Sequence, residues 1–262
     1  MYISENGAKE LICSIGKQMA AKQYVAANDG NITIRVGDNA FIVTPTGINK
    51  GELTPDKLLK VDFDGNILEG SYKPTSELFM HLGIYKADNS LQSTCHAHTP
   101  YLSVFAVAGI ELDFASTLSA VCGPGRVPVS PYFCAGTAEL ANSVASYVKD
   151  YHVVNMANHG PISWGKTPHE AWYRLDEAEC ICRIATLLRY TFNRERPLSC
   201  EQIKYAIGFH NVEINDKAVL SGAEMTDNDR IGIPLSQLPS PSVSLDNETI
   251  EKLAEKIAKK LK

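Results

Sequence analysis

Apolar side chains recur at helical and at strand spacing through most of the chain. Residues 5–22 have apolar positions at Leu11, Ile12, Ile15 and Met19, the spacing of an amphipathic helix. Residues 32–36 alternate like a strand between two turn clusters. The same criteria predict further helices near 76–86, 101–108, 137–149 and 167–193, and strands near 41–43, 58–63, 67–69, 92–98, 153–157 and 161–164. This mixture indicates an α/β protein.

The pattern changes toward the C-terminus. Residues 216–243 show few periodic features and place prolines among serines, which is typical of a linker. In residues 244–262, Ile250, Leu253, Ile257 and Leu261 form one stripe of a helix that ends in lysines. Such a short helix is marginal in water by itself, so it is expected to need a partner surface. We therefore predict a catalytic domain at 1–215, a linker at 216–243 and an amphipathic helix at 244–262.

Composition limits the function classes. A net charge of −5 over 262 residues argues against a nucleic-acid binder, which normally presents a basic face. No apolar run approaches the ~20 residues that span a bilayer. The first residues lack the basic and apolar regions of a signal peptide. We expect a cytoplasmic protein without a membrane partner.

Two histidines at the end of a predicted strand are candidate metal ligands. His96 and His98 are two residues apart, so in a strand they project from the same face. Catalytic zinc usually takes three protein ligands and leaves one position open. His159, in Asn158-His159-Gly160, is the third candidate ligand, and Glu77 supplies a carboxylate.

Each further candidate also has a purely structural interpretation. The loop Thr44-Pro45-Thr46-Gly47 offers hydroxyl groups and backbone amides that can hold a phosphate, although most such loops only turn the chain. Glu77, in the first turn of its helix, could simply be stabilised by the helix dipole. His81 lies four residues later on the same helix face, where we favour a packing or hydrogen-bonding role over metal ligation.

Together these motifs resemble a known family. Gly30-Asn31, Thr44–Gly47, Thr75-Ser76-Glu77, His96-Ala97-His98 and Asn158-His159-Gly160 occur in the order seen in the class II aldolase/adducin family, most like its zinc-dependent fuculose phosphate aldolases. The resemblance covers roughly residues 5–195. It implies a single three-layer α/β/α domain with a mainly antiparallel central sheet. It also implies a homotetramer with active sites between neighbouring subunits.

The resemblance also assigns roles to residues. It makes His96, His98 and His159 the ligands of one Zn²⁺ per subunit, and Glu77 the catalytic acid/base. It places the substrate phosphate on Asn31, Thr46, Gly47, Thr75 and Ser76. The implied reaction cleaves a ketose 1-phosphate, of the fuculose or rhamnulose type, to dihydroxyacetone phosphate and an aldehyde such as lactaldehyde.

The chemistry suits these residue types. Breaking the C–C bond of a ketose phosphate leaves an enediolate, whose charge a zinc ion can stabilise as a Lewis acid. A neighbouring carboxylate can then move the proton at the adjacent carbon. The epimerases of the family have an aspartate at the position of Glu77, so the glutamate favours aldol cleavage. An epimerase, decarboxylase or dehydratase stays open as an alternative, as does a non-catalytic adducin-like assembly module, which would be expected to lack the histidines.

Two segments depart from the family pattern. Fuculose phosphate aldolases have a tyrosine that protonates the aldehyde-side oxygen, but the sequence around Thr117 contains none. A hydroxyl of Ser116 or Thr117, or a water molecule, could replace it. The C-terminal helix is similar to encapsulation peptides, which bind shell proteins of bacterial microcompartments. The alternative is a helix that packs on a neighbouring subunit.

Overall fold

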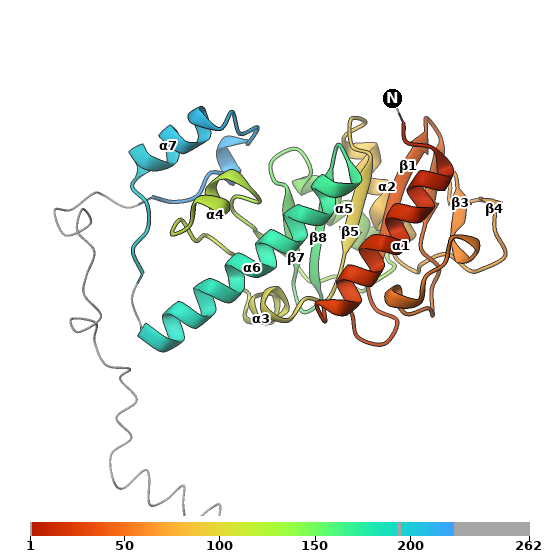
Figure 1. Cartoon of the computed structure of the whole chain (residues 1–262), viewed down its shortest axis with the longest axis horizontal. Coiled ribbons are helices and arrows are strands. Elements are labelled where there is room, and N and C mark those ends of the chain that lie inside the picture. The colour runs from red at the N-terminus through yellow and green to blue at the C-terminus, as the bar shows by residue number, and fades with distance from the viewer. Residues whose placement is uncertain (1, 193–194, 223–262) are drawn as a thin grey trace, which may run out of the picture.

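In the part of the chain that the structure describes, the strands form one eight-stranded sheet (Figure 1). The computed structural model describes residues 2–192 and 195–222. The strand order of the sheet is β4-β3-β2-β1-β5-β8-β7-β6, and every neighbouring pair is antiparallel except β6 and β7. The mainly antiparallel sheet implied by the family resemblance is thus confirmed. The strands are β1 (Asn31–Gly37), β2 (Ala40–Val43), β3 (Leu59–Val61), β4 (Ile67–Glu69), β5 (Ser93–His96), β6 (Val129–Ser130), β7 (Val153–Met156) and β8 (Gly160–Gly165).

Helices cover both faces of this sheet, as the predicted three-layer α/β/α architecture requires (Figure 1). One face packs against α1 (Glu5–Ala21) and α6 (Pro168–Phe192), and the other against α2 (Leu78–Ala87) and α5 (Ala138–Tyr147). Strand alternation sorts the side chains between the layers. In β2, Ile42 joins the core under α1, whereas Phe41 and Val43 join the core under α2.

A third core lies beside the sheet, where α6 extends past it. It is formed with α3 (Pro100–Ala108), α4 (Leu118–Cys122) and α7 (Cys200–Phe209). No helix or strand was predicted at 110–136, but this segment contains α4 and β6, and α7 was not predicted either. Ser199 and Gln202 form a capping box at the start of α7, a signal that is readable in the sequence.

The predicted linker differs from the structure at its start. Residues 216–222 include a short 3-10 helix, Asp216–Ala218, and bury Ala218 and Leu220. The linker prediction is therefore wrong for these residues, because Leu220 belongs to the third core and Val219 packs against it. The rest of the predicted linker and the helix at 244–262 lie outside the described residues.

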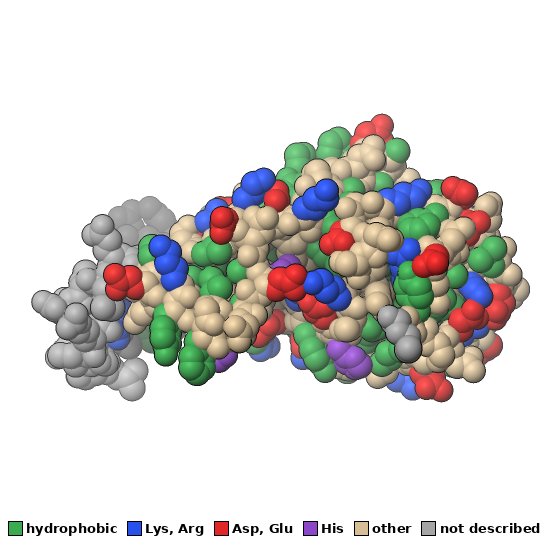
Figure 2. Space-filling view, turned by 90° about the horizontal axis from the view of Figure 1, so that it is seen from above, with side chains coloured by type: hydrophobic (Ala, Val, Ile, Leu, Met, Phe, Trp, Pro, Cys, Tyr) green, Lys and Arg blue, Asp and Glu red, His purple; other side chains and the backbone are tan. Residues whose placement is uncertain are grey.

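No described helix combines the length and apolar character needed to cross a bilayer. Figure 2 shows acidic and basic side chains intermixed on the face that it presents. That face thus lacks the continuous basic area typical of nucleic-acid binding.

A buried carboxylate fixes the beginning of α3. Glu179 of α6 is 3% exposed and accepts hydrogen bonds from the backbone N–H groups of Tyr101 and Leu102, both at 2.8 Å. Free N–H groups at a helix N-terminus favour a negative charge. Because α3 begins two residues after His98, this contact also anchors the turn that holds the candidate ligand.

We expect Glu179→Ala to destabilise the protein by about 2–3 kcal/mol, because it leaves two buried N–H groups without an acceptor. Urea unfolding monitored by circular dichroism measures this change. Glu10→Ala, on the exposed side of α1, is the matched control and should change the unfolding free energy by less than about 0.5 kcal/mol. Equal stabilities of the two variants would contradict the anchoring role.

Candidate metal centre

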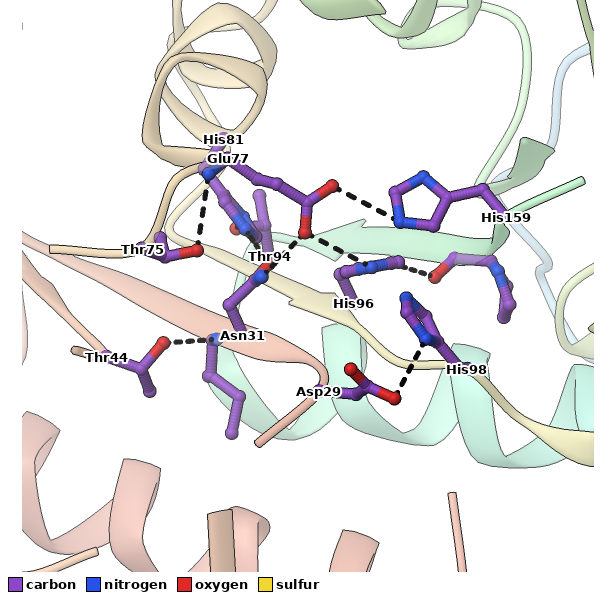
Figure 3. Close-up of polar contacts among 12 residues, drawn as sticks. Asp29, Asn31, Thr44, Thr75, Glu77, His81, Thr94, His96, His98 and His159 are labelled. Atoms are coloured by element: carbon purple, nitrogen blue, oxygen red, sulfur yellow. Dashed lines mark hydrogen bonds and ion pairs between the residues drawn. The ribbon is translucent and has the colours of Figure 1, made fainter. Parts of the chain in front are cut away.

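Three histidine rings converge at one end of the sheet (Figure 3). His96 ends β5, His98 follows two residues later, and His159 lies in the turn between β7 and β8. One ring nitrogen from each histidine lies within 4.8 Å of those of the other two. The ring centroids are 4.8–5.1 Å apart, and each pair of rings meets edge to face. The residues predicted as metal ligands thus lie together, close enough to share one metal ion.

The backbone explains why His159 reaches the other two. Asn158 has a positive φ of 56°, which asparagine tolerates better than most residues and which makes the β7–β8 turn tight. A Cβ atom on Gly160 would lie 2.7 Å from the carbonyl oxygen of Ala97, so only glycine permits this approach. The Asn158-His159-Gly160 sequence therefore presses the His159 turn against the segment between His96 and His98.

Hydrogen bonds orient the rings. The Nδ1–H of His96 donates to the carbonyl oxygen of Pro161 at 2.8 Å, so the Nε2 of His96 has a free lone pair. The carboxylate of Asp29 lies 3.3 Å from the Nδ1 of His98 and favours the same arrangement there. Burial lowers the pKa of His96 well below its ordinary value, and that of His159 in the same direction. Both rings are therefore neutral near pH 7, the form that binds metal.

Glu77 faces the histidines with both carboxylate oxygens. Oε2 lies 3.4 Å from the Nε2 of His96, and Oε1 lies 3.4 Å from the Nε2 of His159. The Nε2 of His96 and the Oε1 of Glu77 are buried and make no hydrogen bond within the described residues. Unpaired buried polar atoms are rare because they cost free energy. A divalent cation would satisfy both, and three imidazoles with an adjacent carboxylate suit a first-row metal such as zinc.

A buried row of polar side chains holds Glu77 in place. Glu77, His81 and Tyr85 are spaced by four residues and form one stripe along α2 and the residue before it. This stripe forms hydrogen bonds with Asn31 and Thr33 of β1 and with Thr94 of β5, whose side chains lie on the α2 side of the sheet. In the register of β1 and β5, Asn31 is paired with His96 and Thr33 with Thr94. His81 thus has the hydrogen-bonding role predicted for it.

Proton positions in this row follow from its chemistry. The amide nitrogen of Asn31 donates to Glu77 Oε2 at 2.8 Å, so its oxygen accepts from the Nε2–H of His81. The Nδ1 of His81 then accepts from the hydroxyl of Thr94, 2.6 Å away. Burial lowers the pKa of His81 to about 3, which keeps this ring neutral. The neutral ring therefore fixes which end of the Asn31 amide points at Glu77.

The residues predicted to hold a phosphate lie along an adjacent edge. Backbone hydrogen bonds join Thr75 to Thr44 at 3.2 Å and Thr46 to Lys73 at 3.0 Å, so the two predicted segments run side by side. Thr46, Gly47 and Ser76 are exposed there, and Thr75 is buried. Asn31 joins this edge at the start of β1, but its side chain points toward Glu77 and His81 (Figure 3).

Comparison with known proteins gives the family. Residues 10–186 match the Class II Aldolase and Adducin N-terminal domain. The chain belongs to this family. It is similar to a 3-oxo-tetronate 4-phosphate decarboxylase of Pectobacterium atrosepticum, 31% identical over 71% of this chain and 86% of that protein. An L-fuculose phosphate aldolase of Methanococcus maripaludis is 34% identical over 62% and 87% of the two chains. A solved L-fuculose 1-phosphate aldolase superposes with a TM-score of 0.73 at 26% identity, over 80% of this chain and 98% of that one.

Family membership makes the chain a metal-dependent lyase. The hydroxyl groups of Ser116 and Thr117, which could replace the tyrosine of the fuculose phosphate aldolases, have structural partners. Ser116 donates to Glu195 at 3.0 Å, and Thr117 caps α4. Neither bonds to a residue of the histidine–Glu77 site within the described chain. Sequence reasoning also missed Asp29, which precedes the Gly30-Asn31 motif and contacts His98.

The buried hydrogen bonds of His81 predict how the free energy of unfolding of this class II aldolase family member depends on pH. The folded pKa of His81 is about 3, whereas an unfolded histidine titrates near its ordinary value of 6.5. Between these values the unfolded chain binds one proton more, so stability falls as pH falls, by at most about 1.4 kcal/mol per pH unit. His81→Gln should make the decline shallower, measured as urea unfolding free energies from pH 7 to pH 4.5. His169→Gln, at an exposed site, is the control. Identical slopes in wild type and His81→Gln would refute this assignment.

Proposed function

We propose that the protein is a zinc-dependent aldolase that cleaves a ketose 1-phosphate of the fuculose or rhamnulose type. The products are dihydroxyacetone phosphate and an aldehyde such as lactaldehyde. The observation that supports this most directly is the Glu77 carboxylate, which is buried against His96 and His159 and has one unpaired oxygen. The similarity to fuculose phosphate aldolases agrees with it.

In this proposal His96, His98 and His159 hold the zinc ion. The ion would supply Lewis-acid stabilisation of the negative charge that develops on the substrate oxygens as the C–C bond breaks. Glu77 exchanges a proton with the carbon next to the broken bond, as base in one direction and acid in the other. Asn31 holds the carboxylate of Glu77 through its Oε2, so that Oε1 faces the reacting centre.

The exposed edge beside this centre receives the phosphate. The exposed residues Thr46 and Ser76 present hydroxyl groups there, and Gly47 presents its backbone N–H group. The buried residues Thr75 and Asn31 complete the proposed phosphate ligands. Gly47 has a φ of 76°, and no atom would lie within 4 Å of a Cβ on it, so the loop leaves open space for a ligand. Backbone amides in such a turn favour an anion.

A decarboxylase acting on a 3-oxo-tetronate phosphate is the second candidate. Its support is the Pectobacterium relative, whose identity of 31% is close to the 34% of the Methanococcus aldolase. The same metal and carboxylate would serve either reaction, because both generate negative charge beside a carbonyl group. The glutamate at position 77 favours these lyase reactions over the epimerase alternative.

Assembly and location complete the proposal. We propose a cytoplasmic homotetramer, which would cover apolar side chains such as Val104 and Val107, 58% and 67% exposed on α3. We also propose that residues 244–262 bind a microcompartment shell protein. The support for that binding is the amphipathic sequence pattern alone.

A substrate panel tests the function. Purified protein is assayed with ketose 1-phosphates for dihydroxyacetone phosphate, and with 3-oxo-tetronate phosphates for carbon dioxide. We expect aldol cleavage that a chelator abolishes and added zinc restores. Glu77→Gln should retain zinc, measured by metal analysis, but lose turnover by about 10²-fold or more, the contribution usual for a general acid/base. Release of carbon dioxide alone would establish the second candidate, and full activity of Glu77→Gln would remove Glu77 from the mechanism.

A further inference from the structure

Lys50 is a buried cation between two of the three segments that contain the proposed phosphate ligands. Its side chain is 1% exposed, and its ammonium donates to the carbonyl oxygens of Asn28 at 2.8 Å and Ile48 at 2.7 Å. Asn28 lies three residues before Asn31, and Ile48 directly follows Gly47. One ammonium group therefore joins the 28–31 turn to the 46–48 loop.

Neighbouring contacts fix the position of this lysine. A Cβ atom on Gly16 of α1 would lie 2.3 Å from the carbonyl oxygen of Lys50, so the helix packs directly on its backbone. The side-chain amide of Asn49 donates to the carbonyl oxygen of Ala27 at 2.7 Å, a second link directly beside these two segments. The ammonium of Lys50 is thus held in place before any ligand binds.

The charge of Lys50 lacks an ion-pair partner among the described residues. Burial lowers its pKa to about 8, which leaves the ammonium mostly protonated near pH 7, and the charge of Asp29 acts in the opposite direction. A buried charge without a partner costs free energy that a neutral side chain would avoid. The positive charge of Lys50 also interacts electrostatically with the metal centre, where it helps to lower the pKa of His96.

The proposed phosphate ligands need such a charge. Asn31, Thr46, Gly47, Thr75 and Ser76 are all neutral. A phosphate monoester has a charge of about −1.5 to −2 near pH 7. Lys73, two residues before Thr75, is exposed, so water and salt screen its charge. The buried ammonium of Lys50 is screened far less.

We propose that Lys50 is a positioning residue for the substrate phosphate: its ammonium holds the 28–31 turn against the 46–48 loop and supplies the positive charge that the ligands at this edge lack. The inference rests on the proposed phosphate-binding function. It deepens that function by assigning the selection of a dianionic group to a buried lysine that joins two of the segments containing these ligands.

The test uses inorganic phosphate as a competitive inhibitor of the zinc-loaded, full-length enzyme. Lys50→Met removes the charge and the donors, whereas Lys50→Gln keeps an N–H donor and removes only the charge. In both variants we expect the inhibition constant of phosphate and the KM of the sugar phosphate to rise about tenfold or more, with kcat changed by less than about threefold. Lys57→Met is the matched control, because Lys57 also donates to a backbone carbonyl, that of Glu52 at 2.8 Å, in the next turn of the chain.

The outcomes separate the inference from the function on which it rests. Unchanged inhibition constants in both Lys50 variants, with a wild type that phosphate inhibits, would overturn the role of Lys50 and leave the phosphate site intact. A fall in kcat of about tenfold or more in Lys50→Gln, together with a lower melting temperature, would show that Lys50 acts only as a structural brace, and would overturn its role as the source of positive charge for the phosphate. A wild type that phosphate does not inhibit would remove the proposed phosphate site itself, and the inference with it.

Discussion

The row of buried hydrogen bonds between α2 and the sheet is the constraint on which the site depends. An apolar layer covers both sides of the sheet, yet Thr33, Thr94 and His81 place polar atoms within it. Each must find a partner, because an unpaired polar group there costs about 1–3 kcal/mol. These groups find their partners when α2 packs in one particular position against β1 and β5. The row of hydrogen bonds therefore fixes where the helix begins relative to the strand ends.

That register determines the chemistry. Glu77 directly precedes α2, and the row ends on its carboxylate through Asn31. The two strand ends that form the other side of the site, at Asn31 and His96, are paired with each other. The carboxylate and the first histidine are therefore positioned by regular secondary structure, and only His98 and His159 depend on turns. Anchoring of α3 by Glu179 and the close approach at Gly160 make these turns rigid. Preorganised groups of this kind need little rearrangement during a reaction.

Local sequence signals predicted much of this arrangement. The two-residue spacing of His96 and His98 indicated that their rings would lie together, although β5 ends at His96 and His98 lies in the turn that follows. The order of the five motifs indicated which distant turn would supply His159. The spacing of Glu77 and His81 placed both on one helix face. Other features depend on tertiary contacts that no local pattern contains. The sequence does not distinguish Lys50 from a surface lysine. Its burial depends on the tertiary contact with α1, where Gly16 packs against its backbone. Residues 216–222 look like a linker in the sequence because the core that buries Leu220 is formed mainly by α3, α4 and α6, which are distant in the sequence.

The central claim is that the three imidazoles share one cation opposite Glu77. Anomalous diffraction at the zinc absorption edge, from crystals of the zinc-loaded protein, tests it most directly. We expect one strong peak per subunit, about 2.0–2.1 Å from a ring nitrogen of each of His96, His98 and His159. A peak at other residues, or no peak among these rings in protein that binds zinc in solution, would contradict it.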